Sequence, residues 1–174
     1  LDRPFDAIDL WTRVLDHDPE HADALQELGR LYYAEERWDE LVGILERELE
    51  LTDDADEQLG LYKSLGTVWG EKLGSEGPAL DAWTDVLEID PNEIEALRSV
   101  RDLYTRQGDY EELAPILERL IAHEETPEEE KLELWVELAE IRGEMLLDTD
   151  AAIEAWQKVV SIDPEHGRAL DELE

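Results

Sequence analysis

The densest reactive side chains of this 174-residue sequence are carboxylates, which gather in two short segments. The first segment holds Asp53, Asp54, Asp56 and Glu57, and the second holds Glu124, Glu125, Glu128, Glu129 and Glu130. Such oxygens could bind calcium, but an EF-hand loop also needs a central glycine and a terminal glutamate at fixed spacing. Neither segment has this spacing. We therefore expect solvated loops and helix starts, where the helix dipole favours negative charge.

Histidine and hydroxyl side chains do not form a recognisable catalytic pattern. His17, His21 and His166 flank Asp-Pro turns, and His123 lies near another junction. No two histidines share one helix face at the four-residue spacing of a metal-binding pair. The serines and threonines lack a nucleophile elbow, and there is no glycine-rich phosphate loop. We therefore predict no catalytic residues, no metal site and no cofactor.

Composition restricts the classes of partner. The 49 acidic and 15 basic residues give a net charge of −34, which repels phosphate backbones and disfavours nucleic acid. The apolar runs are too short for a membrane span, so we expect no membrane insertion. The sequence has no cysteine and does not open with a signal peptide. The compartment stays open, with the cytoplasm slightly favoured.

Tryptophans mark an internal repeat. Trp11, Trp83 and Trp156 each begin the pattern W-x-x-V-x-x-x-D-P-x-x-x-x-A-L, and the two intervals between them are nearly equal. A fixed period indicates a solenoid, and weaker copies begin about halfway through each long one. Aromatic residues at helical spacing are more typical of a core than of a ligand cage, so we expect the tryptophans to hold the repeats together.

The same segments have the periodicity of helices. Between 38 and 49, the residues Trp38, Leu41, Val42, Leu45 and Leu49 fall on one face of an α-helix. Each Asp-Pro dipeptide of the repeats predicts a helix start, since Asp caps free amides and Pro is tolerated at the first helical position. No segment alternates convincingly with period two. The predicted fold class is all-α.

These residues resemble the tetratricopeptide repeat, with the theme W-x-x-L-G-x-x-Y followed by a small residue, an aromatic, a small residue and Pro. The best match is ALDAWTDVLEIDP, in which Ala79, Trp83 and Pro91 take the small, aromatic and proline places. The resemblance implies a bacterial array protein that forms a right-handed α-α superhelix of about ten antiparallel helices. We expect one array over 1–174, cut from a longer one. Its repeats are 22–55, 59–93, 94–127 and 132–166, with half repeats 1–21 and 167–174.

Some positions depart from this theme. Leu41 and Leu113 occupy the first small position, and Glu48 and Leu120 occupy the second. Larger side chains at these positions should open the packing between helices of alternate repeats.

The resemblance also implies a concave inner face formed by the first helix of each repeat. Its residues would be Gln26, Arg30, Tyr33, Lys63, Thr67, Arg98, Asp102 and Arg106. One interpretation is a locally positive groove that accepts an acidic or extended peptide. The other is that Arg30, Arg98 and Arg106 pair with neighbouring carboxylates. A clamp for a C-terminal carboxylate is not supported, because the only asparagine, Asn92, lies in a turn.

We therefore predict a non-enzymatic scaffold that binds a protein or peptide partner on its concave face. One alternative is a structural or self-assembling acidic array adapted to salt. Another is the repeat arm of a larger enzyme or of a secretion or motility machinery. Neither end looks covered, which adds end-to-end self-association to the expectations. The residues concerned are Phe5, Ile8, Leu10 and Val14 in the first helix and Ala169, Leu170 and Leu173 in the last.

Overall fold

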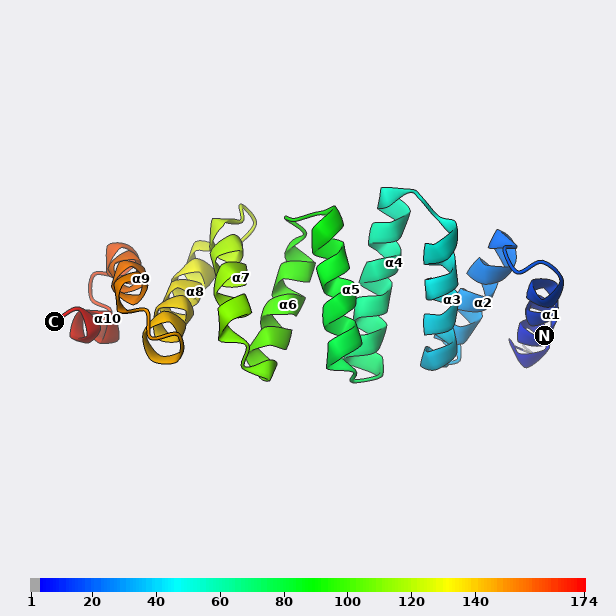
Figure 1. Ribbon diagram of the computed structural model, residues 1–174, viewed down its shortest axis with the longest axis horizontal. Helices are drawn as coiled ribbons and strands as arrows, with labels where there is room; N and C mark the ends of the chain where they lie inside the picture. The colour runs from blue at the N-terminus through cyan, green and yellow to red at the C-terminus, as the bar shows by residue number, and fades with distance from the viewer. Residues whose placement is uncertain (1–3) are drawn as a thin grey trace. The chain divides into compact units, whose positions relative to one another are not determined.

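The computed structural model describes residues 4–174, which form ten α-helices, two short π-helical turns and no strand (Figure 1). This confirms the all-α fold class and the expected number of helices. The first three residues of the predicted half repeat 1–21 lie outside the described residues. The chain divides into a first compact unit that ends at Asp90 and a second one, Pro91–Glu174. The single array over 1–174 stays a prediction.

Each unit is a succession of helices. The first contains α1 (Pro4–His17), α2 (Ala22–Ala34), α3 (Trp38–Leu51), α4 (Ala55–Thr67), the π-turn η1 (Val68–Lys72) and α5 (Glu76–Ile89). The second contains α6 (Ile94–Gln107), α7 (Tyr110–Ala122), α8 (Glu128–Glu140), the π-turn η2 (Ile141–Met145), α9 (Thr149–Ile162) and α10 (Gly167–Leu173). Within each unit a helix packs mainly against the helices before and after it in the sequence.

Several acidic and histidine side chains cap helices. His21 and His166 directly precede α2 and α10 and cap them: each accepts a hydrogen bond from the backbone amide three residues on, at 3.3 and 3.2 Å. The prediction that the Asp-Pro dipeptides begin these helices is wrong, because Pro19 and Pro164 lie in the turns before the caps. At the start of α4, the Asp54 carboxylate accepts hydrogen bonds from the amides of Asp56 and Glu57, both at 3.0 Å. Such caps satisfy amides that have no partner within the helix. These side chains therefore have structural roles at helix starts.

Tryptophans of the repeated pattern hold helix pairs together. The Trp83 indole of α5 lies directly on Gly66 of α4, where an added Cβ would come within 2.6 Å of the ring. In the second unit Trp156 packs in a cluster with Ala139, the counterpart of Gly66, and both are buried. Trp83 is 5% exposed. The indoles are therefore core residues, as their helical spacing indicates.

Two loops require a left-handed backbone, and the copies fill these positions differently. After η1 the position is Gly74, with φ 64°, whereas after η2 it is Leu147, with φ 56°. After α2 it is Glu36, with φ 55°, whereas after α6 it is Gly108, with φ 71°. A side chain at positive φ costs about 1–2 kcal/mol, because Cβ approaches the following carbonyl oxygen. The chain thus carries strain at Glu36 and Leu147.

We predict that Leu147→Gly stabilises the protein by about 0.5–1 kcal/mol. The left-handed strain disappears, little packing is lost because Leu147 is 78% exposed, and the greater freedom of glycine in the unfolded chain offsets part of the gain. Urea denaturation measures the change. The reverse substitution Gly74→Leu should destabilise the first unit, and equal stability of both variants and the wild type would contradict the strain argument.

Candidate functional site

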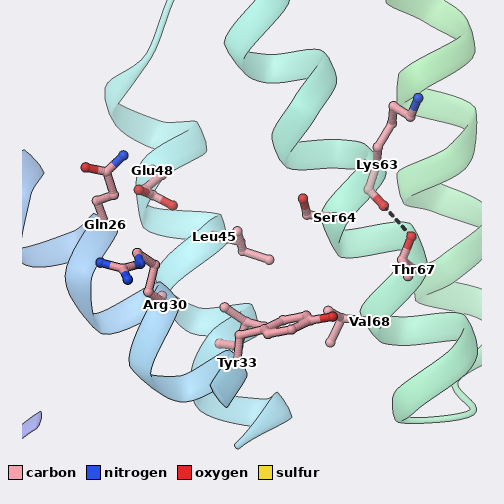
Figure 2. Close-up of a pocket in the computed structure, with 11 residues that line it drawn as sticks. Gln26, Arg30, Tyr33, Leu45, Glu48, Lys63, Ser64, Thr67 and Val68 are labelled. Carbon is pink, nitrogen blue, oxygen red and sulfur yellow. Dashed lines mark hydrogen bonds between the residues drawn. The ribbon is translucent and has the colours of Figure 1, made fainter. Parts of the chain in front are cut away.

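A cavity of about 670 Å³ lies in the first unit between α2, α3 and α4. Leu41 and Leu45 of α3 and Val68 of η1 provide apolar surface. Its polar lining residues are Gln26, Arg30, Tyr33, Glu48, Lys63, Ser64 and Thr67. Figure 2 shows Gln26, Arg30 and Glu48 on one side of this α2–α4 cavity, and Lys63, Ser64 and Thr67 on the other.

The α2–α4 cavity brings together five of the residues that the sequence places on the inner face. They are Gln26, Arg30, Tyr33, Lys63 and Thr67. Sequence reasoning missed Gly29, Glu48 and Ser64 as lining residues. Glu48 carried a signal, because it stands where the repeat theme has a small residue.

Side-chain size accounts for the opening. Leu41 and Glu48 of α3 both line the cavity. Gly29 and Ser64 leave space between α2 and α4, and a Cβ added at Gly29 would meet only ordinary contacts, with Ile44 at 3.6 Å and Leu41 at 3.9 Å. Leu113 and Leu120, the counterparts of Leu41 and Glu48, are also large and are fully buried, so large residues at these positions do not by themselves open the packing. The space in the first unit is left by the small residues Gly29 and Ser64.

In the second unit the corresponding positions hold an ion pair. When the two copies of the repeat are aligned on Trp11, Trp83 and Trp156, Arg101 is the counterpart of Gly29 and Glu137 is the counterpart of Ser64. Nη2 of Arg101 lies 2.6 Å from Oε2 of Glu137. The counterpart of Glu48 is Leu120, which is fully buried. One copy therefore has two small side chains where the other has a long, charged pair.

The charges around the α2–α4 cavity are unevenly satisfied. Nη1 of Arg30 lies 2.9 and 3.2 Å from the two carboxylate oxygens of Glu27. Glu48 is half-buried, and within residues 4–174 its carboxylate has no hydrogen bond or ion pair. Burial raises the pKa of Glu48 above its usual value, and the nearby negative charge of Glu57 adds to this effect. Glu48 is thus a partly desolvated carboxylate without a counterion.

Tyr33 forms an exposed aromatic edge to the cavity. Its side chain is 59% exposed. The ring meets the Trp38 ring edge-on, with centroids 5.4 Å apart and an interplanar angle of 82°, which is a favoured geometry for an aromatic pair. This contact restricts the ring on the protein side and leaves its other surface available to a ligand.

The predicted inner-face residues of the second unit lie on α6. Nη2 of Arg98 is 2.9 Å from Oε2 of Glu130 on α8. Asp102 and Arg106 are exposed on the same helix. For Arg30 and Arg98, pairing with carboxylates is what the structure contains, so these two guanidinium groups do not form a strongly positive groove.

Other kinds of site are not found in the described part of the chain. Among residues 4–174, no cluster of three potential metal ligands is arranged to hold an ion. In the same range every helix is too short or too polar to cross a lipid bilayer.

Comparison with known families identifies the repeat. A family model described as tetratricopeptide repeat matches residues 24–59 and 96–131. The first match covers α2, α3 and the start of α4, and the second covers the corresponding part of the second unit. No curated protein matches the sequence.

Solved structures share the fold. The chain is similar to YrrB, described as a TPR protein with an unusual peptide-binding site, with 22% identity, a TM-score of 0.54, and coverage of 97% of this chain and 82% of that one. It is also similar to MamA, with 17% identity, a TM-score of 0.55, and coverage of 92% and 89%. A TPR repeat-containing protein from Cytophaga hutchinsonii, solved as its C-terminal part, matches with 19% identity, a TM-score of 0.51, and coverage of 96% and 66%.

We predict that Glu48→Gln raises the thermal unfolding midpoint at neutral pH, because the wild-type protein must bury part of a charged carboxylate. The folded state holds the Glu48 proton more tightly than the unfolded chain does. The wild type therefore gains stability as the pH falls from the raised pKa of the folded state to the ordinary pKa of 4.5 in the unfolded chain. Below pH 4.5, the stability advantage of Glu48→Gln should disappear.

Calorimetry at a series of pH values measures this difference. Glu46→Gln is the control, because Glu46 lies exposed on the same helix and does not line the cavity. An advantage of Glu48→Gln that grows as the pH falls would contradict the assignment.

Proposed function

We propose that this chain, which contains tetratricopeptide repeats at residues 24–59 and 96–131, is a non-enzymatic scaffold that holds an extended partner segment in the α2–α4 cavity. The observation that carries this proposal is the cavity itself, lined by five of the residues predicted for the inner face. Ligand sites commonly have volumes of about 300–1,000 Å³, with apolar walls and a few polar groups that fix orientation. The cavity, at about 670 Å³, has this character.

The arrangement of lining residues suits an extended segment. Apolar side chains of the partner would contact Leu41, Leu45 and Val68, while Gln26 and Ser64 offer hydrogen-bonding groups on opposite walls. Tyr33 adds an aromatic surface at the edge, which is a common anchor in protein recognition. YrrB, a protein with the same fold, is described as having an unusual peptide-binding site, and we extend peptide binding to this chain as part of the proposal.

Self-association through the end helices is a second candidate. Phe5 and Leu10 of α1 are 67% and 61% exposed, and Leu170 of α10 is 42% exposed. The expectation is wrong for Ile8 and Ala169, which are buried in the packing of the end helices. Phe5 and Leu10 lie about 140° apart around α1, so they present exposed apolar surface on two sides of this helix, which favours an interface. Sedimentation analysis of the wild type and of a Phe5→Asp, Leu10→Asp variant distinguishes the cases. Concentration-dependent oligomers that the variant abolishes would support self-association, and a wild type that is monomeric at high concentration would contradict it.

We predict that the double variant Gly29→Arg, Ser64→Glu closes the α2–α4 cavity and weakens partner binding at least tenfold. It copies into the first unit the Arg101–Glu137 pair, which the second unit accommodates at the same places. The probes are peptides selected from a random display library against the wild type, and titration calorimetry measures their affinities.

Gly43→Arg is the matched control. It adds the same side chain on α3 at a position where a Cβ meets nothing within 4 Å, and which does not line the cavity. This control should bind the selected peptides as the wild type does. If the closed variant binds them with unchanged affinity, the partner segment does not occupy the α2–α4 cavity.

A further inference from the structure

The chemistry of the α2–α4 cavity also indicates the kind of segment that it selects. We propose that the partner segment carries a lysine or arginine whose cationic group binds the Glu48 carboxylate, flanked by apolar residues that contact Leu41 and Leu45. The inference rests on the proposed function and adds a specificity to it. Three independent features of the chain support this assignment.

The first feature is the unpaired carboxylate. Glu48 lines the cavity together with Leu41 and Leu45 of the same helix, α3. Within residues 4–174 nothing donates a hydrogen bond to its carboxylate and no cation lies within ion-pair distance. A partly buried charge without a partner is unfavourable. Removing one member of a buried ion pair typically costs more stability than an exposed ion pair contributes. A cation supplied by a ligand removes this penalty and forms a charge-assisted hydrogen bond.

The second feature is that basic residues of the cavity do not take this role. The Arg30 guanidinium is held by both carboxylate oxygens of Glu27 on its own helix. Lys63 stands on the opposite wall, and Figure 2 shows its ammonium group directed away from Glu48. The cavity therefore presents a negative group on the α3 side, and the positive groups beside it are oriented elsewhere.

The third feature is the second unit, which shows how a basic side chain fits between such helices. There Arg101 extends from α6 toward α8 and pairs with Glu137 at 2.6 Å. Its side chain is 31% exposed, so the guanidinium group lies largely between the helices. In the second unit, a basic side chain thus occupies the space that corresponds to the open cavity of the first unit. The acidic partner in the second unit, Glu137, stands at the counterpart of Ser64, whereas Glu48 stands on α3 at the counterpart of Leu120. The first unit thus has an acidic group in the wall of this space, and no basic side chain of the cavity pairs with it.

The charge of the whole chain acts in the same direction. A net charge of −34 attracts basic segments and repels acidic ones before contact, which raises the association rate of the first class. This long-range attraction is screened by salt, whereas the contact with Glu48 is partly shielded from solvent. At constant salt, a substitution inside the cavity changes both the long-range attraction and the contact with Glu48, whereas a substitution outside it changes only the long-range attraction. Comparing the two separates these contributions to binding.

The test uses four peptides of the form acetyl-Ser-Gly-Ser-Leu-X-Leu-Ser-Gly-Ser-amide, in which X is lysine, arginine, norleucine or glutamate. Titrations followed by amide NMR shifts, at about 0.15 M salt, give the affinities for the full chain. We expect the lysine and arginine peptides to bind the wild type at least tenfold more tightly than the norleucine peptide, with shifts at Gly29, Glu48 and Ser64. Glu48→Gln should abolish this preference.

Glu46→Gln is the control for general attraction, because it removes one negative charge from the exposed side of α3. It should keep the tenfold preference. A preference that survives Glu48→Gln, a glutamate peptide that binds as well as the lysine peptide, or no binding by any of the four would overturn the inference. Because Glu48→Gln is expected to be at least as stable as the wild type, a loss of binding does not reflect unfolding.

The closed variant Gly29→Arg, Ser64→Glu separates this inference from the proposed function. If it loses all the peptides while Glu48→Gln does not affect their ranking, the cavity binds segments but does not select a basic residue. If the closed variant binds all of them as the wild type does, both the site and its specificity are wrong.

Discussion

Each helix of this chain must bury its apolar stripe against the helices that precede and follow it, because helices as short as these are marginal in water when alone. Leu25 and Leu28 of α2 are almost fully buried for this reason, as are Leu97 and Val100 at the corresponding places of α6. Within each unit the core therefore consists of the contacts between neighbouring helices, so the stability of the unit depends on how well these contacts are packed. The side chains at the helix contacts decide where the surface is closed and where it is open.

The two units meet this requirement with different side chains. Where α2, α3 and α4 come together, Leu41 and Glu48 line an opening, and the small residues Gly29 and Ser64 leave the space unfilled. The second unit fills the same places with the Arg101–Glu137 pair and with buried Leu120. Repetition thus maintains the stacking of helices, while a few substitutions at the contact give one copy a cavity.

The high negative charge has several local consequences rather than one. Asp54 caps a helix, Glu27 and Glu130 neutralise arginines on the predicted inner face, and Glu48 remains unpaired in a cavity wall. Exposed ion pairs such as that of Arg30 contribute little to stability, but they remove positive charge from the groove. The unpaired carboxylate is the costly exception, and protein sites with such exceptions are frequently functional.

Much of the architecture could be predicted from the sequence. The nearly equal intervals between Trp11, Trp83 and Trp156, together with helical spacing of the apolar residues, determine the all-α repeat fold. The resemblance to the tetratricopeptide repeat, rather than periodicity alone, implies that Gln26, Arg30 and Tyr33 of α2 share a surface with Lys63 and Thr67 of α4. Leu41 and Glu48 could also be recognised as too large for their positions.

The cavity itself could not be predicted, because its volume depends on residues of different helices, such as Gly29 and Ser64. The ion-pair partners of Arg30 and Arg98 could not be predicted either, because in so acidic a chain several carboxylates lie within reach of each arginine. Only the packing of α3 against α4 decides that Glu48 is half-buried without a counterion. The sequence by itself determined which helices form and which side chains share a face, because periodicity is local. The tertiary structure decided which gaps stay open and which charges stay unpaired, because both depend on distances between helices.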